Sequence, residues 1–381
     1  MTWRNKTVEE ERLDFILMIA NSTLTFEEIC NHYQISRKTG YKWLKRYQLH
    51  GQEGLKDLSR KRLTQEHKIC EEIKESIIAV KKQYPLWGPK KIHAFMKISF
   101  SDKSLPSVSS IGNILKDYDL CQSRRYRKHI AKTAPLSHCK KPNDIWMYDF
   151  KGPFYTLNGQ KCEPLTITDG YSRYLIACEH LTRKTEAEVW MVLEQAFREY
   201  GLPNKIRSDN GPPFATISVG RLSRLAVKLI KVGITPEWIE PGCPEQNGRH
   251  ERFHATLKME TANPSAFNLN MQKEKFKQFK VYYNTIRPHE ALDFNVPSQL
   301  YTSSFRKWDG KFKSPEYTSD SEIRKVEISG HVNWKGYKFF LSEVLKGEFV
   351  AIKEIEYGLM GIYFGPILLA NIDLNKGFKK I

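Results

Sequence analysis

The feature that most restricts the fold of this chain is the order of hydrophobic patterns after Pro142. "DIWMYDFKGPFYT" alternates apolar and polar side chains as a strand does, and "CEPLTITDGYSRYLIACEHL" predicts two more strands around a turn at Asp169. Strand and helix patterns then alternate. Three consecutive strands followed by this alternation indicate a mixed sheet flanked by helices, so residues 141–305 are predicted to form an α/β domain.

Residues 1–60 carry the pattern of a helix-turn-helix domain made of three amphipathic helices. Thr25 and Glu28 have the spacing of a capping box before the second helix, and Ser36 can cap the third. A short turn joins these two helices, as in DNA-binding modules of this type. Gln34 occupies the turn position where glycine is usual, which predicts a strained turn or a looser variant of the motif.

The charge of the chain is concentrated in its first part. Residues 1–142 hold 28 Lys and Arg against 15 Asp and Glu, while the whole chain has a net charge of +18. An excess of this kind is typical of proteins that bind nucleic acid. The predicted third helix presents four cations outward, which we expect to contact double-stranded DNA: Arg37, Lys38, Lys42 and Lys45.

Residues 61–140 are predicted to form a second helical, winged-helix-like module for DNA binding. An amphipathic helix over 65–83 is followed by a helical pair, whose last member can be capped by Ser107 or Ser109. The segment 121–142 is strongly basic and unpatterned, and it predicts a linker that lies along phosphates.

The end of the chain differs again, because residues 320–381 contain short alternating segments between turn signals. This pattern predicts a small β-barrel. No apolar run reaches membrane-spanning length, and the seven cysteines are scattered without a CxxC pair. We therefore expect no membrane association and a cytoplasmic, nucleoid-associated protein with reduced thiols.

Two aspartates lie where apolar strands leave little reason for a charge. Asp149 is inside "IWMYDFKG", and Asp209 ends a strand in "IRSDNGPPF". Strand positions are rigid and strand ends open onto crevices, so both suit an active site. The alternatives are a water-facing carboxylate on an edge strand for Asp149 and an Asp-Asn-Gly turn for Asp209. A third acid, Asp169, is predicted to be a turn residue paired with Arg173.

Carboxylates that converge without a histidine or thiolate cluster predict hard oxygen ligands for Mg²⁺ or Mn²⁺. In a chain that binds DNA, they indicate a centre with two ions for phosphoryl transfer. One ion activates the attacking oxygen and the other stabilises the leaving oxygen. The chain has no GxxxxGK[ST] loop, so ATP hydrolysis is not indicated.

Five segments, through their order and spacing, resemble the integrase-type catalytic core of bacterial insertion-sequence transposases: "WMYDFKG", "ITDGYSRYL", "RSDNGPPF", "PGCPEQNGRHERFHATLKME" and "YNTIRPHEALDFNVPSQLY". The resemblance covers about residues 140–305, and the helical modules upstream match the same arrangement. This family of DDE enzymes has an RNase H-like fold and is related to retroviral integrases. The resemblance implies two Mg²⁺ ions, nicking at transposon ends, attack of the freed 3′-OH on target DNA, and a homo-oligomer on paired ends.

The third acid of the resemblance is either Glu245 or Glu251. Thirty-five residues separate Asp209 from Glu245, which is the spacing common in the family. The local sequence favours Glu251, because the family's glutamate follows a Pro-x-x-Gln/Asn-Gly stretch and precedes a helix that ends in Leu-Lys. A single long helix over 218–233 is expected to account for the six additional residues. Glu245 follows a proline in a loop or first turn, whereas Glu251 lies inside a helix anchored by Phe253.

The face of Glu251 also carries His254 and Lys258, at i+3 and i+7, and we expect both to contact DNA. The resemblance therefore implies a transposase that binds terminal inverted repeats and catalyses metal-dependent strand cleavage and strand transfer. The alternative is a domesticated or decayed transposase that acts as a helix-turn-helix regulator. The intact set of Asp149, Asp209 and Glu251 argues against this alternative.

Overall fold

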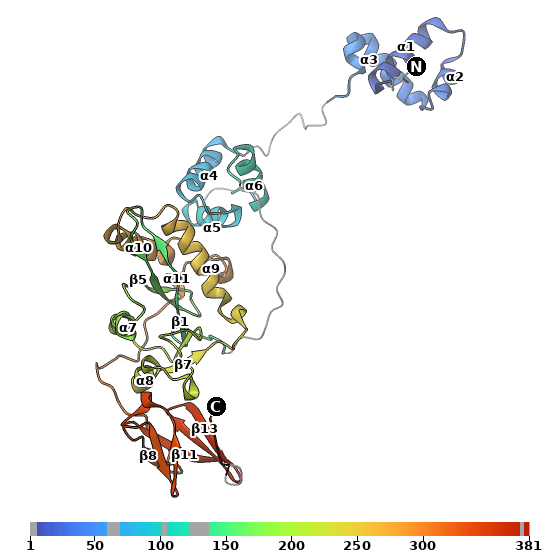
Figure 1. Ribbon diagram of the computed structural model, residues 1–381. Coiled ribbons are helices and arrows are strands. Elements are labelled where there is room, and N and C mark those ends of the chain that lie inside the picture. Colours follow the sequence, from blue (N-terminus) through green and yellow to red (C-terminus); the bar gives the residue numbers. More distant parts are fainter. Residues whose placement is uncertain (1–5, 59–68, 101–104, 122–136, 374–376, 381) are drawn as a thin grey trace. The chain divides into compact units, whose positions relative to one another are not determined.

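The computed structural model describes the chain except for residues 1–5, 59–68, 101–104, 122–136, 374–376 and 381. The chain divides into two compact units, Met1–Cys70 and Glu71–Ile381. Figure 1 shows the two units and labels their helices and strands.

The first unit contains the three predicted helices followed by a 3₁₀ turn: α1 (Val8–Asn21), α2 (Phe26–His32), α3 (Arg37–His50) and η1 (Gly51–Leu55). Both predicted caps are present, since Thr25 and Glu28 form a capping box on α2 and the Ser36 hydroxyl accepts from the Thr39 amide of α3 at 3.2 Å. Gln34 adopts a left-handed φ of 52°, which confirms a strained turn.

The core of the first unit is small and aromatic. Phe15, Ile29 and Trp43 are buried in it. The Trp43 ring lies under two guanidinium groups, with Arg12 at 3.8 Å and Arg46 at 4.7 Å from the ring centroid. These contacts attach the apolar side of α3 to the core of the first unit, so the opposite side of the helix faces water.

A second helical group opens the second unit: α4 (Glu71–Gln83), α5 (Pro89–Ser99) and α6 (Val108–Asp117). Residues 65–68 of the predicted first helix lie outside the described residues, as does most of the basic segment 121–142. Of the two predicted caps for α6, Ser107 is the one observed. The group contacts the rest of the unit through Trp87, whose indole N–H donates to the Tyr282 hydroxyl at 2.8 Å.

The predicted α/β domain is built on a mixed five-stranded sheet in the order β5-β4-β1-β6-β7. β1 pairs antiparallel with β4 and parallel with β6. The predicted turn at Asp169 joins β4 to β5. The strands are β1 (Ile145–Phe150), β4 (Pro164–Asp169), β5 (Leu175–His180), β6 (Lys205–Ser208) and β7 (Thr235–Trp238), and a small hairpin consists of β2 (Phe154–Tyr155) and β3 (Lys161–Cys162).

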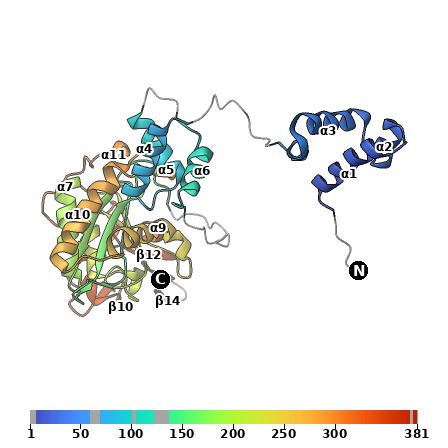
Figure 2. The ribbon, with the colours of Figure 1, turned by 90° about the horizontal axis from the view of Figure 1, so that it is seen from above.

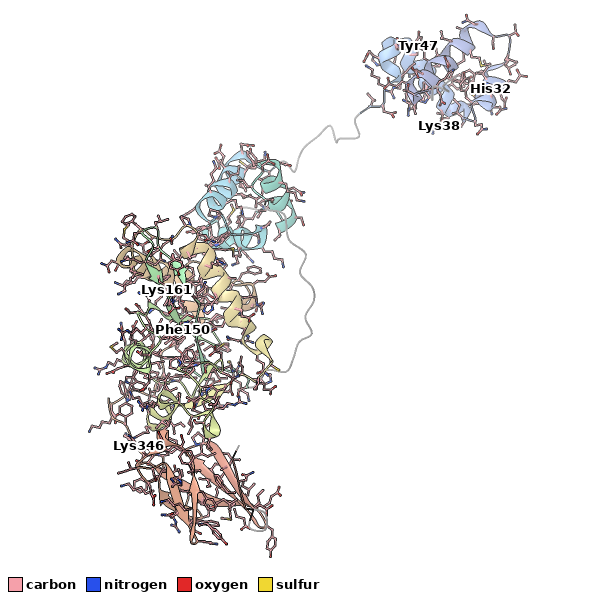
Figure 3. The ribbon with its side chains drawn as sticks, in the orientation of Figure 1. His32, Lys38, Tyr47, Phe150, Lys161 and Lys346 are labelled. Atoms are coloured by element: carbon pink, nitrogen blue, oxygen red, sulfur yellow. The ribbon has the colours of Figure 1, made fainter. Side chains whose placement is uncertain are left out.

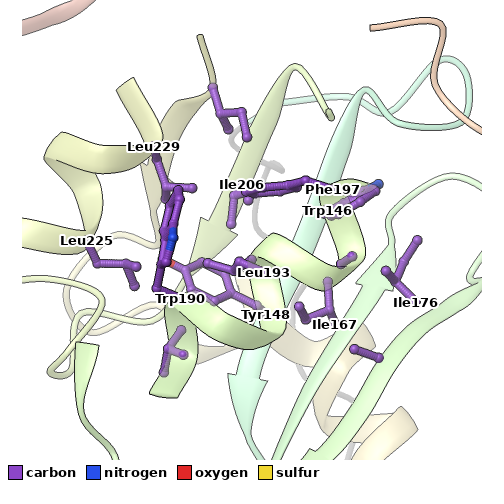
Figure 4. Packing of buried hydrophobic residues seen from close by; sticks show 14 of the residues in the cluster. Trp146, Tyr148, Ile167, Ile176, Trp190, Leu193, Phe197, Ile206, Leu225 and Leu229 are labelled. Carbon is purple, nitrogen blue, oxygen red and sulfur yellow. The ribbon is translucent and has the colours of Figure 1, made fainter. Parts of the chain in front are cut away.

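Helices cover both faces of this sheet. Trp146 and Tyr148 of β1 point to one face, where they pack with α7 and α8 (Figure 4). Alternation along the strand therefore directs Met147 and Asp149 to the opposite face. That face is covered by α9 and α10, which lie side by side in Figures 1 and 2, and Phe253 of α9 is buried between them.

The remaining elements of the domain are mostly helical. They are α7 (Glu186–Tyr200), η2 (Val219–Arg221), α8 (Arg224–Lys231), η3 (Pro244–Asn247), α9 (Gly248–Leu257), the π-helix η4 (Lys258–Ala262), α10 (Leu269–Thr285), η5 (Glu290–Leu292) and α11 (Pro297–Leu300). The single long helix predicted over 218–233 is wrong. Gly220 has a φ of 62°, which breaks the segment into a 3₁₀ turn and the shorter α8, capped by Ser223.

The C-terminal region is rich in β-structure, as predicted, and includes a half-barrel. Its five-stranded sheet has the order β14-β13-β12-β11-β8, and β9 and β10 form a separate hairpin. Residues of α8 such as Val227 pack with the strands in one buried cluster. The elements are β8 (Glu322–Lys325), β9 (His331–Trp334), β10 (Tyr337–Phe340), η6 (Glu343–Leu345), β11 (Phe349–Glu356), β12 (Leu359–Phe364), β13 (Ile367–Asp373) and β14 (Gly377–Lys380).

Candidate active site

Asp149 lies near the end of the central strand β1, on the sheet face that α9 covers. Its carboxylate is half-buried, and one of its oxygens, Oδ2, accepts from the side-chain amide of Asn247 at 2.9 Å. Burial, followed by the negative charge of Asp209 and more weakly that of Glu251, raises the pKa of Asp149 to about 6. The carboxylates of Asp209 and Glu251 are therefore close enough to disfavour the charged form of Asp149.

Asp209 directly follows β6, the strand beside β1. Its Oδ1 accepts from the Gly211 amide at 3.1 Å, so the loop orients the carboxylate through the backbone. Asn210 ties the same loop to the next strand, because its amide donates to the Ile239 carbonyl at 2.8 Å. The Asp-Asn-Gly turn and the acid at a strand end thus coexist in one loop.

Glu251 lies on α9, while Glu245 lies in the preceding 3₁₀ turn η3. Phe253 and Leu257 are buried and fix α9 against the sheet. The Glu251 side chain is exposed. The side chain of Glu245 is outside the described part of the chain, but its backbone occupies the turn that was expected.

A hydrogen-bonded network attaches α9 to the strands behind the acids. Thr166 pairs with Asp149 across the sheet, and its hydroxyl lies 2.7 Å from Nε2 of both His250 and His254. The hydroxyl also donates to the Asp149 carbonyl at 3.2 Å. All three bonds are satisfied if each imidazole carries its proton on Nε2 and donates to the hydroxyl oxygen.

Both imidazoles of this network are neutral near pH 7. Burial lowers the pKa of His254 to about 3, and the charge of Lys151 lowers it further in the same direction. Burial likewise holds the pKa of His250 well below its ordinary value. The structure therefore places His254, expected as a DNA contact, in a neutral and half-buried position that supports α9.

Two lysines lie beside this network. Lys151 follows β1, and burial, followed by the charge of Lys258, lowers its pKa. Lys258 is exposed at the end of α9, on the face of Glu251. The expected DNA contact Lys258 thus has a cationic neighbour, and the two can meet a phosphate together.

The three acids offer only carboxylate oxygens, which are the donor atoms that a hard divalent cation prefers. The negative charges that act on Asp149 are those of the other two acids. Within the described ranges, however, no three His, Cys, Asp or Glu side chains lie close enough to hold one ion together. The three acids therefore fit the cation by the type of their donor atoms. Glu251 lies on an exposed helix face, so its side chain is the one most free to approach the cation.

The four cations expected on α3 are all exposed on the first unit: Arg37, Lys38, Lys42 and Lys45. Figure 3 labels Lys38 at the surface of this unit. Arg37 forms an ion pair with Glu27 at 3.3 Å, and the Lys42 ammonium lies 4.7 Å from the Trp43 ring centroid.

Other expectations were corrected or extended by the structure. Asp169 is the last residue of β4, directly before the turn, and its carboxylate accepts from Ser172 at 2.7 Å and from the Asn143 amide at 2.8 Å instead of pairing with Arg173. Sequence reasoning also missed Asn247 and Thr166 as partners of Asp149. The period-two alternation of β4 could have placed Thr166 on the face of the acids, whereas no local signal reveals the contact of Asn247.

Comparison with protein families finds two kinds of domain. Residues 140–244 and 232–297 match the integrase core domain. Residues 11–62 match a helix-turn-helix domain and residues 39–115 a homeodomain-like domain. The mixed α/β unit thus has an integrase-core fold, preceded by helical segments of the helix-turn-helix type.

Two of the relatives come from insertion elements. The chain is 28% identical over 229 residues to the insertion element IS476 uncharacterized 39.2 kDa protein of Xanthomonas euvesicatoria, a match that covers 58% of this chain and 61% of that protein. It therefore spans about three fifths of the length of this relative. It is 29% identical over 189 residues to the transposase for insertion sequence element IS904 of Lactococcus lactis, covering 46% of this chain and 72% of that one.

The chain is 16% identical to a solved structure of the HTLV-2 integrase catalytic core domain in complex with magnesium. The match covers 43% of this chain and 99% of that one, with a TM-score of 0.32.

Among the described residues, no helix is long and apolar enough to cross a membrane.

Proposed function

We propose that this chain, which carries an integrase core domain and helix-turn-helix domains and has insertion-element proteins as relatives, is a transposase. It binds the terminal inverted repeats of its element, cleaves a DNA strand at each end, and joins the freed strand to target DNA. The reaction is a metal-dependent phosphoryl transfer at Asp149, Asp209 and Glu251.

One observation carries this proposal. Asp149, on the middle strand of the sheet, is under the electrostatic influence of two other carboxylates, Asp209 directly after the neighbouring strand and Glu251 on a helix packed on the same face. Repulsion among uncompensated carboxylates is unfavourable unless a cation joins them, and oxygen-only ligands select Mg²⁺ or Mn²⁺. Such a set therefore supports a metal site rather than a structural ion-pair network.

The side chains around the acids have separate tasks in this reaction. Asp149, in β1, and Asp209, directly after β6, would hold the cations, and Glu251 would complete the set from α9. When bound, two such ions activate the attacking oxygen and neutralise the charge on the leaving oxygen. Asn247 donates to Oδ2 of Asp149 and so orients this carboxylate.

The cations beside the acids orient the DNA strand. Lys258 is exposed and Lys151 is half-buried, and among the described residues neither forms an ion pair with a carboxylate. They contact phosphates on either side of the scissile bond. His254 and His250, neutral and bonded to Thr166, keep Glu251 in register with the strands.

Recognition of the element's ends belongs to α3. Its exposed cations approach the phosphates and base edges of the major groove, as in other helix-turn-helix proteins. Two ends must be held during one reaction, so the active form is a homo-oligomer assembled on DNA.

The metal requirement tests the proposal. The full chain is freed of metal with EDTA and incubated with a labelled duplex that carries the inverted repeat flanking its gene. We expect nicking at the repeat end with Mg²⁺ or Mn²⁺, and little with Ca²⁺, whose looser geometry misplaces the attacking oxygen. Full activity in EDTA would end the metal-dependent mechanism. Specific binding without nicking in any ion would favour the regulator.

A further inference from the structure

Three arginines gather beside the first turns of α9. Arg249 and Arg252 lie at i and i+3 on this helix, and Arg173 follows the turn between β4 and β5. The Arg249 guanidinium donates to the Gly170 carbonyl of that turn at 3.0 Å. This bond brings Arg249 over the turn from which Arg173 projects.

The proximity of the three groups is supported by their surroundings. Arg173 and Arg249 line the same small cavity, of about 20 Å³, together with Phe253 and Tyr283. Burial lowers the pKa of Arg173, and the positive charges of Arg249 and Arg252 lower it further. All three guanidinium groups nevertheless stay charged, since arginine does not deprotonate in proteins.

No carboxylate of the described chain compensates this cluster. None of the three guanidinium groups takes part in an ion pair among the described residues, and Arg252 donates only to the Gly248 carbonyl, at 3.3 Å. The nearest buried acid, Asp169, directs its oxygens to Ser172 and the Asn143 amide. Arg173 also acts on His289, because its positive charge helps those of Lys91 and Arg287 to lower the pKa of this imidazole.

Arg249 is turned away from the strand held at the acids, and Arg252 lies between the two, about 100° around the helix from Glu251. Glu251 and Lys258 share one face of α9, whereas Arg249 lies at i−2 from Glu251, nearly opposite on the helix. An α-helix with side chains is about 10–12 Å thick. A phosphate at the acids is therefore separated from a phosphate at Arg249 by the body of the helix.

We propose that Arg173, Arg249 and Arg252 form a second phosphate-binding site of the core, which holds a DNA backbone phosphate other than the one at the acids. This inference rests on the proposed function only in that its ligand is DNA. Guanidinium groups suit this ligand because their planar donors bind phosphate oxygens in pairs. The half-buried Arg173 supports the two exposed arginines, which make the first contact with the ligand.

The phosphate has two possible sources: the same duplex beyond the cleaved end, or a second duplex. The test compares the full wild-type chain with Arg249→Gln/Arg252→Gln. As a matched control, Arg183→Gln/Arg198→Gln removes two exposed arginines near or on α7, on the other face of the sheet. A charge-keeping variant, Arg249→Lys/Arg252→Lys, separates loss of the ligand from loss of the fold.

The first arm measures the affinity for a short and a long terminal-repeat duplex against salt concentration. Each phosphate contact contributes about 0.9 to the slope of log K against log salt. If the same duplex supplies the phosphate, we expect the glutamine variant to lose about one unit of slope and about tenfold in affinity on the long duplex only. The lysine variant keeps the slope, and the control matches the wild type.

The second arm measures capture of a second labelled duplex by a preformed protein–DNA complex. If the second duplex supplies the phosphate, capture falls about tenfold in the glutamine variant, while binding of the first duplex is unchanged. Unchanged slopes and unchanged capture would overturn the site. So would a variant whose only defect is weaker self-association without DNA, because the cluster would then meet carboxylates of a second copy.

Nicking of the terminal duplex is measured in the same samples. A glutamine variant that binds both duplexes normally but nicks poorly would also overturn the proposal, since the arginines would then act on the acids. If the wild type never nicks but the binding difference persists, the second site stands and the proposed function fails.

Discussion

Two helices of this protein, α3 and α9, are similarly rich in charge but use it differently. α3 exposes its cations on one side and buries Gly40 and Trp43 on the other. α9 presents Glu251 on one face and Arg249 on nearly the opposite one, and it buries His250 and Phe253 against the sheet. The charges of α3 form one surface, whereas those of α9 belong to different surroundings.

The first turns of the two helices show the same contrast. Ser36 caps α3 through its hydroxyl. Asn247 occupies the N-cap position of α9, yet it makes no capping bond there and donates to Asp149 instead. Asparagine is among the best capping residues, so its use elsewhere costs helix stability. The comparison teaches that α3 is organised by its own sequence, and α9 by the site on which it packs.

The largest expected effect on activity distinguishes Glu251, on α9, from Glu245, in the 3₁₀ turn before it. Glu251→Gln keeps size and hydrogen bonding but removes a charge that holds a metal, so we expect cleavage of a labelled terminal-repeat duplex to fall by roughly three orders of magnitude or more. Glu245→Gln should keep most activity. Asp149→Asn and Asp209→Asn serve as inactive controls. An inactive Glu245→Gln beside an active Glu251→Gln would reverse the assignment.

A second prediction tests the repulsion at Asp149 without any activity assay. Its folded pKa of about 6 lies above the ordinary value of 3.8, so its stability contribution is present below pH 4 and lost as pH rises through 6. In metal-free protein at pH 8, Asp149→Asn should therefore raise the free energy of unfolding, by up to about 3 kcal/mol.

The measurement is denaturant unfolding of both proteins in EDTA from pH 4 to pH 8. The gain should vanish near pH 4, where the wild-type carboxyl is already protonated. A variant that is equally stable or less stable at pH 8 would show that burial and the neighbouring acids do not disfavour the charged form of Asp149 as inferred.

A smaller effect is expected on α3. Lys38→Gln/Lys45→Gln removes two exposed cations and leaves the buried Trp43 side intact. Terminal-repeat affinity should fall about tenfold at low salt, with a shallower salt dependence, because phosphate contacts are lost. Fluorescence anisotropy over a salt series measures it. Unchanged affinity would mean that α3 does not face the DNA.

The smallest effect concerns the two caps. Ser36→Ala should destabilise the first unit by about 1 kcal/mol, since a capping bond is lost. Asn247→Ala removes no capping bond and should change stability less, but it should raise the pKa of Asp149 by removing a donor to the carboxylate. Thermal unfolding reports the first effect, and NMR titration of the Asp149 carboxyl the second. A stability loss at Asn247 as large as that at Ser36 would remove the contrast.

Much of the fold could be predicted from local patterns. The helices of the first unit, the Ser36 cap and the strands around Asp149 follow from periodicity and from residues close together in the chain. The break at Gly220 was missed, because the apolar pattern of 218–233 continues through a residue whose φ of 62° ends the helix. The carboxylate of Asp169 accepts from Asn143, 26 residues upstream, as well as from Ser172, three residues downstream, and only the nearer partner lies within reach of a local pattern.

By itself, the sequence determined which residues could do chemistry: acids within or after apolar strands, and cations on one side of a capped helix. Those features depend on neighbours a few positions away, within reach of a strand's period or a helical turn. Only the tertiary structure decided which of them meet. Asn247 reaches Asp149 across 98 positions, and Arg249 meets the turn of Gly170 across 79, because α9 packs on the sheet. Packing between distant segments depends on the shapes of both surfaces, which no local pattern contains.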